Sequence, residues 1–189
     1  MSEWTIVMPV KGTTASKSRF GPGDHRDLAL AMALDTVATA VRVASVIVVT
    51  VGGAEFQALG ATVVQEHGGG LAAAIDEGLA ASPADRRSAV LLADHPALQA
   101  AELSAALAAA APHERAFVAD AEGTGTALLA ARTPAAHDHA FGTGSRAAHL
   151  ARGYVELAGT WPGLRRDIDV PDHLEDLPLG PRTTEFLRR

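Results

Sequence analysis

Short, continuously apolar runs alternate with segments of helical periodicity along most of this chain. The clearest runs are 5–10 (TIVMPV), 45–50 (SVIVVT) and 89–93 (AVLLA). Between the first two, residues 27–43 repeat apolar side chains at the spacing of one helix face. Continuously apolar strands are typical of a sheet covered on both faces, and their alternation with helices predicts βαβ units. We therefore expect an α/β protein with a mostly parallel sheet.

The remaining elements are expected from shorter patterns and from turn residues. No internal repeat or linker interrupts the pattern, so a single domain over residues 1–189 is expected. Further strands are expected at 61–65, 116–119 and 126–130, helices at 71–81, 101–111 and 145–152, a small polar loop at 134–139, a late strand or extended segment at 167–170, a tail at 177–182 and a terminal helical turn at 183–188.

Composition excludes several classes of function. The chain has 189 residues, a formal net charge of −6 and no cysteine. Thiol catalysis, disulfides and cysteine-ligated metal centres are thereby excluded, and the negative charge argues against non-specific binding of nucleic acid. No apolar run approaches the length of a membrane span, and no secretory leader is recognisable. A cytoplasmic protein is expected, with no membrane or nucleic-acid partner.

Three aspartates are the first candidates for chemistry. Asp94 follows the apolar run 89–93, while Asp167 and Asp169 alternate in a segment expected to be extended, so they point the same way. Carboxylates that meet from separate strands form a hard-oxygen site for Mg²⁺ or Mn²⁺, and magnesium commonly shares its shell with substrate phosphates. Phosphate-transfer chemistry is the resulting hypothesis. The alternatives are a helix-capping role for Asp94 and exposed ion pairs for the later two.

A basic loop and a glycine run are candidates for binding a nucleotide. Lys11, Lys17 and Arg19 follow the first strand in a loop rich in Gly, Ser and Thr, which suits a triphosphate, although the Walker A spacing is absent. Gly68–Gly70 precedes a helix and would let a base or ribose approach the backbone. The alternatives are a solvated basic loop and a flexible turn.

Two glycine and hydroxyl loops are candidates for binding an anion. They are 123–126 (GTGT) and 141–145 (FGTGS), in which Ser145 occupies a helix N-cap position by sequence. Turn chemistry alone is the alternative. The segment 137–139 (HDH) looks like a transition-metal site, but without further ligands nearby in sequence a surface loop is the better interpretation. His95 is interpreted as an ordinary core or surface residue.

Taken in order along the chain, these pieces resemble the CofC/FbiD family, the guanylyltransferases of coenzyme F-420 biosynthesis that act on phosphoenolpyruvate or 2-phospho-L-lactate. The resemblance covers essentially the whole chain. It rests on Pro9-Val10-Lys11, Lys17-Ser18-Arg19, Gly70-Leu71, Ala93-Asp94-x-Pro96, Ala119-Asp120-x-x-Gly123-Thr124-Gly125-Thr126, Phe141-Gly142-x-Gly144-Ser145 and Arg166-Asp167-Ile168-Asp169.

The resemblance implies a nucleotidyltransferase fold of the glycosyltransferase-A-like type, a three-layer α/β/α domain. It also implies that Asp94, Asp167 and Asp169 hold Mg²⁺. Two departures from the family pattern are His95, where Leu is usual, and Ala72, where many members carry Asn. The implied acceptor site is Thr126, Gly142 and Ser145, and the implied GTP site is Lys11, Lys17, Arg19, Gly70 and Leu71, with Lys17 also counted as catalytic.

The expected reaction is attack of an acceptor phosphate oxygen on the α-phosphorus of GTP, with loss of pyrophosphate. The composition resembles that of a high-GC bacterium, which within this family favours phosphoenolpyruvate as acceptor. Hand-over of the product to the next enzyme of the pathway is a further hypothesis. Alternatives are a related cytidylyl or sugar-directed nucleotidyltransferase, whose usual first-loop pattern G-x-S-x-R-x-G is absent here, and a non-catalytic module that binds GTP or a phosphometabolite.

Overall fold

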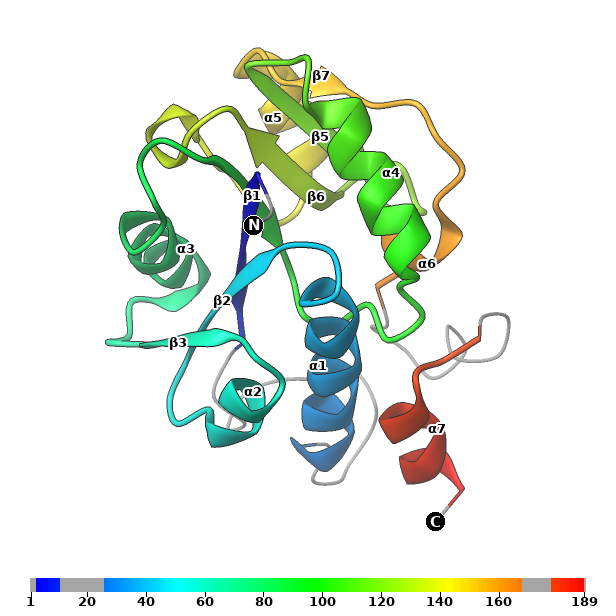
Figure 1. Cartoon of the computed structure of the whole chain (residues 1–189). Coiled ribbons are helices and arrows are strands. Elements are labelled where there is room, and N and C mark those ends of the chain that lie inside the picture. Colours follow the sequence, from blue (N-terminus) through cyan, green and yellow to red (C-terminus); the bar gives the residue numbers. More distant parts are fainter. Residues whose placement is uncertain (1–2, 11–25, 168–177, 189) are drawn as a thin grey trace.

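The computed structural model describes residues 3–10, 26–167 and 178–188. These residues form a seven-stranded sheet in the order β3-β2-β1-β4-β6-β5-β7 (Figure 1). Strands β3, β2, β1 and β4 are mutually parallel, β6 runs antiparallel to β4 and β5, and β7 is parallel to β5. The expected mostly parallel sheet is confirmed. The strands are β1 (Trp4–Pro9), β2 (Ser45–Thr50), β3 (Thr62–Gln65), β4 (Arg87–Leu91), β5 (Arg115–Ala119), β6 (Thr126–Ala131) and β7 (Val155–Glu156).

The helices and strands match most of the expected segments. The helix expected at 27–43 ends at Ala40, and the strand expected to reach residue 93 ends at Leu91. The short elements α2 (Ala54–Ala58), α6 (Pro162–Arg165) and β7 were not expected. No helix in the described ranges has the length and apolarity needed to cross a membrane. The helices are α1 (Arg26–Ala40), α2 (Ala54–Ala58), α3 (Gly70–Ala80), α4 (Ala100–Ala110), the 3₁₀ turn η2 (Pro134–Ala136), α5 (Ser145–Ala151), α6 (Pro162–Arg165) and α7 (Pro181–Leu187).

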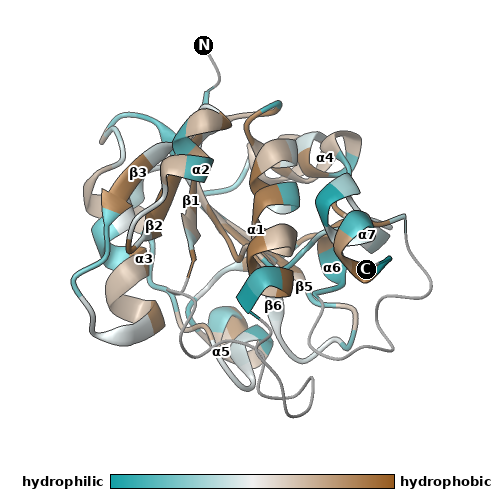
Figure 2. Ribbon diagram, turned by 90° about the horizontal axis from the view of Figure 1, so that it is seen from below, coloured by the Kyte–Doolittle hydropathy of each residue, from teal (hydrophilic) through white to brown (hydrophobic). Residues whose placement is uncertain are grey.

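Each face of the sheet buries its own hydrophobic core. Because successive side chains of a strand point to opposite faces, Ile6 and Met8 pack with residues of α1 and α4, whereas Val7 packs with residues of α3. The strands between these helices are predominantly hydrophobic in Figure 2. Helices therefore cover both faces, and the three-layer α/β/α architecture is confirmed.

The C-terminal helix α7 is fixed to α1 by a buried carboxylate. Asp35 is 3% exposed, and its Oδ2 accepts hydrogen bonds from the backbone N–H of Thr183 at 2.8 Å and from the Thr183 hydroxyl at 2.9 Å. Its Oδ1 accepts the N–H of Arg182 at 3.2 Å. Asp35 thus satisfies N–H groups that the first turn of a helix leaves without intrahelical partners. The segment expected to be a tail followed by one helical turn is a docked helix that begins at Pro181.

Candidate active site

One edge of the sheet gathers most of the candidate residues. Strands β1, β2, β4 and β5 all end there, and the antiparallel β6 begins there. The register pairs Leu91 with Leu128 and Ala119 with Thr126, so Asp94, Asp120 and Thr126 all emerge at this edge. Ligands of α/β sheets bind outside the carboxyl ends of the strands. The expected location of the site is therefore consistent with the topology.

Asp94 lies in the loop between β4 and α4, with its side chain 25% exposed. The next residue, His95, is buried at 2% exposure, and its N–H donates to the Thr36 hydroxyl on α1 at 3.2 Å. His95 Nε2 lies 3.6 Å from Asp94 Oδ1, which is beyond hydrogen-bond distance. The loop that carries Asp94 is thus anchored to α1, and His95 is a core residue.

Asp167 follows α6, which is fastened to two other loops of the same edge. A Cβ on Gly163 would overlap the carbonyl oxygen of Ala97, so only glycine allows α6 to approach the loop after Asp94 this closely. Gly163 also donates its N–H to Glu102 Oε1 at 3.1 Å. The carbonyl of Arg165 accepts the N–H of Ala121 at 2.8 Å. The segment leading into Asp167 is therefore joined both to the loop of Asp94 and to the loop that follows β5.

Four of the expected site residues, Lys11, Lys17, Arg19 and Asp169, lie outside the described residues. Within residues 3–10, 26–167 and 178–188, no group of three or more His, Asp or Glu side chains is arranged to hold a metal ion. The predicted third carboxylate is Asp169, so the metal assignment of the three aspartates stays a prediction.

The three residues expected to bind the acceptor come together. The hydroxyls of Thr126 and Ser145 lie 3.2 Å apart, with the residues only 8% and 2% exposed, and the carbonyl of Gly142 accepts the Ser145 N–H at 3.1 Å. Ser145 is the first residue of α5 and Gly144 is its N-cap, so the expectation that Ser145 is the cap was wrong by one residue. On the opposite side of Thr126, His149 Nδ1 lies 2.8 Å from the hydroxyl oxygen.

The loop between β5 and β6 is shaped by an internal carboxylate. Asp120 Oδ1 accepts the N–H of Thr124 at 2.9 Å, and Asp120 Oδ2 occupies the space that a Cβ on Gly125 would need. The guanidinium of Arg146 in α5 is held by Glu156 at 2.9 Å, and the backbone N–H of Arg146 donates to the carbonyl of Thr124 at 3.2 Å. The two glycine and hydroxyl loops are thereby held against each other.

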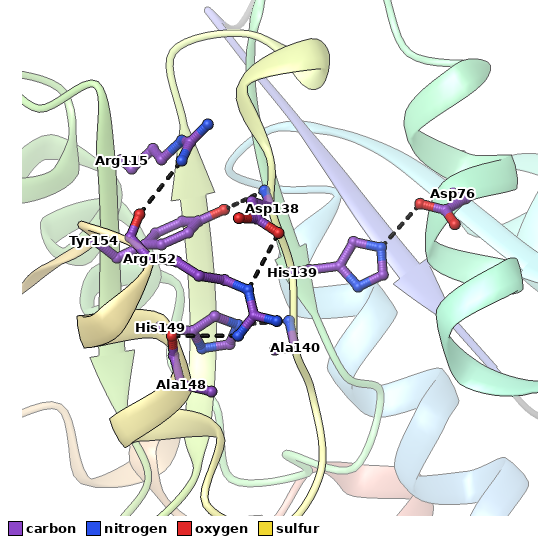
Figure 3. Close-up of polar contacts among 9 residues, drawn as sticks. All are labelled: Asp76, Arg115, Asp138, His139, Ala140, Ala148, His149, Arg152 and Tyr154. Atoms are coloured by element: carbon purple, nitrogen blue, oxygen red, sulfur yellow. Dashed lines mark hydrogen bonds and ion pairs between the residues drawn. The ribbon is translucent and has the colours of Figure 1, made fainter.

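The segment 137–139 bridges separate parts of the fold (Figure 3). His137 Nε2 lies 3.0 Å from the Ser88 hydroxyl of β4, and His139 Nε2 lies 2.9 Å from Asp76 Oδ1 of α3. Burial lowers the pKa of His137 to about 4. The segment is a loop with Asp138 exposed, in agreement with the interpretation as a surface loop, although the imidazoles of His137 and His139 are partly buried and hydrogen-bonded. The same residues take no part in a metal cluster within the described chain.

Gly70 and Leu71 open α3. Gly68, Gly69 and Gly70 all have positive φ, which favours glycine for conformational reasons, and Leu71 packs against the core on the α3 side of the sheet. The turn interpretation is therefore supported, and a contact with a nucleotide stays a prediction.

Two residues of this region were missed by sequence reasoning. Asp120 belongs to a motif that carries the family resemblance, but no role was assigned to it, because its function is to shape a loop. His149 follows Ser145 by one helical turn, so the spacing i, i+4 on one helix face was the signal that could have indicated it.

Comparison with known proteins gives a consistent assignment. A family model described as "Guanylyl transferase CofC like" matches residues 4–156. The phosphoenolpyruvate guanylyltransferase of Geodermatophilus obscurus is 45% identical over 97% of this chain and 94% of its own length. That of Thermomonospora curvata is 46% identical over 98% of this chain and 89% of its own length.

Solved structures with lower identity share the fold. Rv0371c of Mycobacterium tuberculosis, in complex with manganese, superposes with a TM-score of 0.60 at 21% identity, covering 91% of this chain and 95% of its own. The 4-diphosphocytidyl-2C-methyl-D-erythritol synthase of Anaerococcus prevotii gives 0.59 at 11% identity, covering 100% and 97%. The expected nucleotidyltransferase-like fold is confirmed.

Proposed function

The chain belongs to the guanylyl transferase CofC-like family, and we propose that it transfers GMP from GTP to the phosphate of phosphoenolpyruvate, releasing pyrophosphate, in coenzyme F-420 biosynthesis. The observation that carries the proposal is the similarity, over nearly the whole length, to proteins named phosphoenolpyruvate guanylyltransferase. The paired hydroxyls of Thr126 and Ser145 at the carboxyl edge of the sheet support it, because they suit a small anionic acceptor.

The acceptor is proposed to lie against Thr126, Gly142 and Ser145. In this position the hydroxyl pair, one proton of which is used between Ser145 and Thr126, donates its other proton in a hydrogen bond to a carboxylate or phosphate oxygen of the acceptor. Both hydroxyls are buried and mutually hydrogen-bonded, so little rotational freedom remains to be lost on binding. This side of the site supplies orientation, which is one of the two main contributions an enzyme makes when it joins two anions.

The triphosphate of GTP is proposed to lie along Lys11, Lys17 and Arg19, with the base or ribose near Gly70 and Leu71. The three cations offset the charge that builds on pyrophosphate as it leaves, and Lys17 is the proposed catalytic residue among them.

Asp94, Asp167 and Asp169 are the proposed ligands of a divalent ion, Mg²⁺ by preference. The described part of the donor set is compatible with this proposal: Asp94 and Asp167 are carboxylates on loops that α6 connects, and the Asp94 side chain is partly exposed. Hard oxygen ligands of this type suit Mg²⁺ and Mn²⁺. When bound, the ion supplies charge neutralisation for the phosphates of both reactants.

In the proposed step a phosphate oxygen of phosphoenolpyruvate forms a bond to the α-phosphorus of GTP. The bond from that phosphorus to the oxygen bridging the α- and β-phosphates breaks, and pyrophosphate leaves with the electron pair. The nucleophile is an anion at neutral pH, so no side chain has to remove a proton. The new bond is a phosphoanhydride between two phosphates, so the product is a guanosine diphosphate diester of the acid, which we propose is handed to the next enzyme in the cytoplasm.

The test is a matrix of nucleotides and acceptors with Mg²⁺ and pyrophosphate release as readout. We expect release with GTP and phosphoenolpyruvate, little release with ATP, CTP or UTP, and less with 2-phospho-L-lactate. Release with CTP instead of GTP would reassign the donor, and release with 2-phospho-L-lactate alone would reassign the acceptor. If GTP bound without release in any combination, the protein would be a binding module.

A further inference from the structure

Three buried polar side chains form a short relay beside the proposed acceptor site. His149 of α5 is fully buried, and its Nδ1 lies 2.8 Å from the hydroxyl oxygen of Thr126. Thr126 in turn lies 3.2 Å from the hydroxyl of Ser145. On the other side of the ring, His149 Nε2 lies 2.9 Å from the backbone nitrogen of Ala140 (Figure 3).

The backbone of Ala140 fixes the tautomer of His149. A backbone N–H only donates, so Nε2 has to be the acceptor, and the single proton of the neutral ring is on Nδ1. Nδ1 therefore donates to Thr126. Burial lowers the pKa of His149 to about 4, which keeps the ring neutral near pH 7.

Three aromatic rings hold the imidazole in this orientation. The ring centroids of Tyr154, Phe141 and Phe117 lie 5.3, 5.5 and 6.0 Å from that of His149. Turning the ring over would place carbon atoms against both Ala140 N–H and Thr126, and would leave a buried donor without its partner. The enclosure and the two hydrogen bonds thus define one orientation.

The proton count of the two hydroxyls follows from this tautomer. Each hydroxyl has one proton to donate and two lone pairs to accept with. One of the two protons is used between Thr126 and Ser145, and Thr126 takes its additional hydrogen bond from His149. The other hydroxyl proton has no acceptor within the trio and remains available to a ligand. With the opposite tautomer, Thr126 would donate to Nδ1 and Ser145 would donate to Thr126, so neither proton would remain.

We propose that His149 is a positioning residue that, through its fixed Nδ1–H tautomer, turns the Thr126–Ser145 pair into a hydrogen-bond donor for the anionic acceptor. The inference rests on the proposed function for the identity of that acceptor. It explains how a pair of neutral hydroxyls is set to receive a carboxylate or phosphate oxygen, which accepts hydrogen bonds and donates none. His149 acts through Thr126 and touches no reactant itself.

Two substitutions separate the two hydrogen bonds of the ring. In His149→Asn the side-chain amide nitrogen takes the place of Nδ1, so the donor to Thr126 is kept. The acceptor for the Ala140 N–H is lost. In His149→Gln the amide oxygen reaches the position of Nε2, so the acceptor for Ala140 is kept and the donor to Thr126 is lost. Each variant is the matched control for the other.

The two variants are expected to rank in opposite order for thermal stability and for binding of the acceptor. His149→Asn is expected to lower Tm more than His149→Gln, because it leaves the Ala140 N–H buried without a partner. His149→Gln is expected to raise KM for phosphoenolpyruvate by about tenfold or more, because the Thr126 hydroxyl loses the hydrogen bond that orients its proton toward the ligand, and His149→Asn by only about two- to threefold. The KM for GTP is expected to stay unchanged in both. A rise in the acceptor KM that simply follows the loss of Tm would overturn the proposal and leave His149 a structural residue.

A measurement that needs no turnover keeps this inference apart from the proposed function. The ¹⁵N shifts of the His149 ring, assigned by their loss in His149→Gln, are expected to show a protonated Nδ1 and an unprotonated Nε2. Phosphoenolpyruvate titrated calorimetrically in the presence of Mg²⁺ and a GTP analogue with a non-cleavable α,β-bridge is expected to bind His149→Asn more tightly than His149→Gln. Protonation at Nε2 would refute the inference even in an active enzyme. Absence of pyrophosphate release from the wild type, with the expected shifts and binding order, would refute the proposed function alone.

Discussion

Acidification is expected to destabilise this fold through two imidazoles, those of the partly buried His137 and the buried His149. Burial lowers the pKa of each to about 4 from an ordinary value of 6.5. Each ring is neutral in the folded chain, whereas the unfolded chain takes up a proton below about pH 6.5. Stability rises with pH wherever the unfolded state binds more protons than the folded state. These two histidines therefore leave the free energy of unfolding undiminished above about pH 6.5, and they lower it progressively as the pH falls from there toward 4.

The magnitude follows from the lowered pKa. A pH of about 5 lies about 1.5 units below the ordinary pKa of histidine, so the imidazole is almost fully protonated in the unfolded chain. In the folded chain it is still mostly neutral at this pH. One pKa unit corresponds to about 1.36 kcal/mol. Lowering the pH from about 7.5 to about 5 is therefore expected to reduce the free energy of unfolding by roughly 2 kcal/mol for each histidine. A loss of this size is a large fraction of the stability of an ordinary domain.

The assay is urea unfolding of the wild type and of His137→Gln at both pH values. Glutamine does not titrate, and its amide reaches the position of Nε2, which lies 3.0 Å from the Ser88 hydroxyl. The loss on acidification is expected to be smaller in the variant by about 2 kcal/mol, whatever its stability at neutral pH. An equal loss in the two proteins would refute the reasoning, because it would mean that His137 takes up its proton without unfolding the chain.

Three further substitutions test the site and its scaffold. Asp94→Asn is expected to leave Tm nearly unchanged and to reduce pyrophosphate release by about a hundredfold or more, because a charged ligand of the proposed ion is lost; wild-type turnover would remove Asp94 from the site. Gly125→Ala is expected to cost roughly 1–3 kcal/mol in urea unfolding, since the new Cβ overlaps the Asp120 carboxylate; unchanged stability would show that the loop yields easily. Asp35→Asn is expected to cost about 2 kcal/mol, because hydrogen bonds from Thr183 to a buried charge are weakened; no change would mean that α7 docks through apolar contacts alone.

The sheet was predictable from sequence because its central strands are buried on both faces. β1 and β2 appear within one residue of the apolar runs that predicted them. The end of α1 was not predictable from periodicity, because Val41 still packs against the core although it lies beyond the helix. Short elements such as α6 depend on tertiary contacts, here the approach of Gly163 to Ala97, and such contacts leave no periodic pattern.

The part of the acceptor site that consists of side-chain hydroxyls was predictable from sequence. Glycine and hydroxyl loops indicated Thr126 and Ser145. His149 gave little signal, because a single histidine is usually a structural residue and its decisive partner is the backbone N–H of Ala140. Which nitrogen carries the proton depends on a contact between two segments, and sequence does not report it.

The charges around α5 indicate that different groups orient the acceptor and attract it in the proposed reaction. Arg146 is paired with Glu156 at 2.9 Å and Arg152 with Asp138 at 3.2 Å, so the arginine of α5 and the arginine at its C-cap are already offset by carboxylates. The donors that face the acceptor are then neutral hydroxyls, which orient an anion but attract it weakly. In a chain of net charge −6, attraction has to come from the proposed metal and the basic loop. We therefore infer that the acceptor binds well only after GTP and the metal are in place.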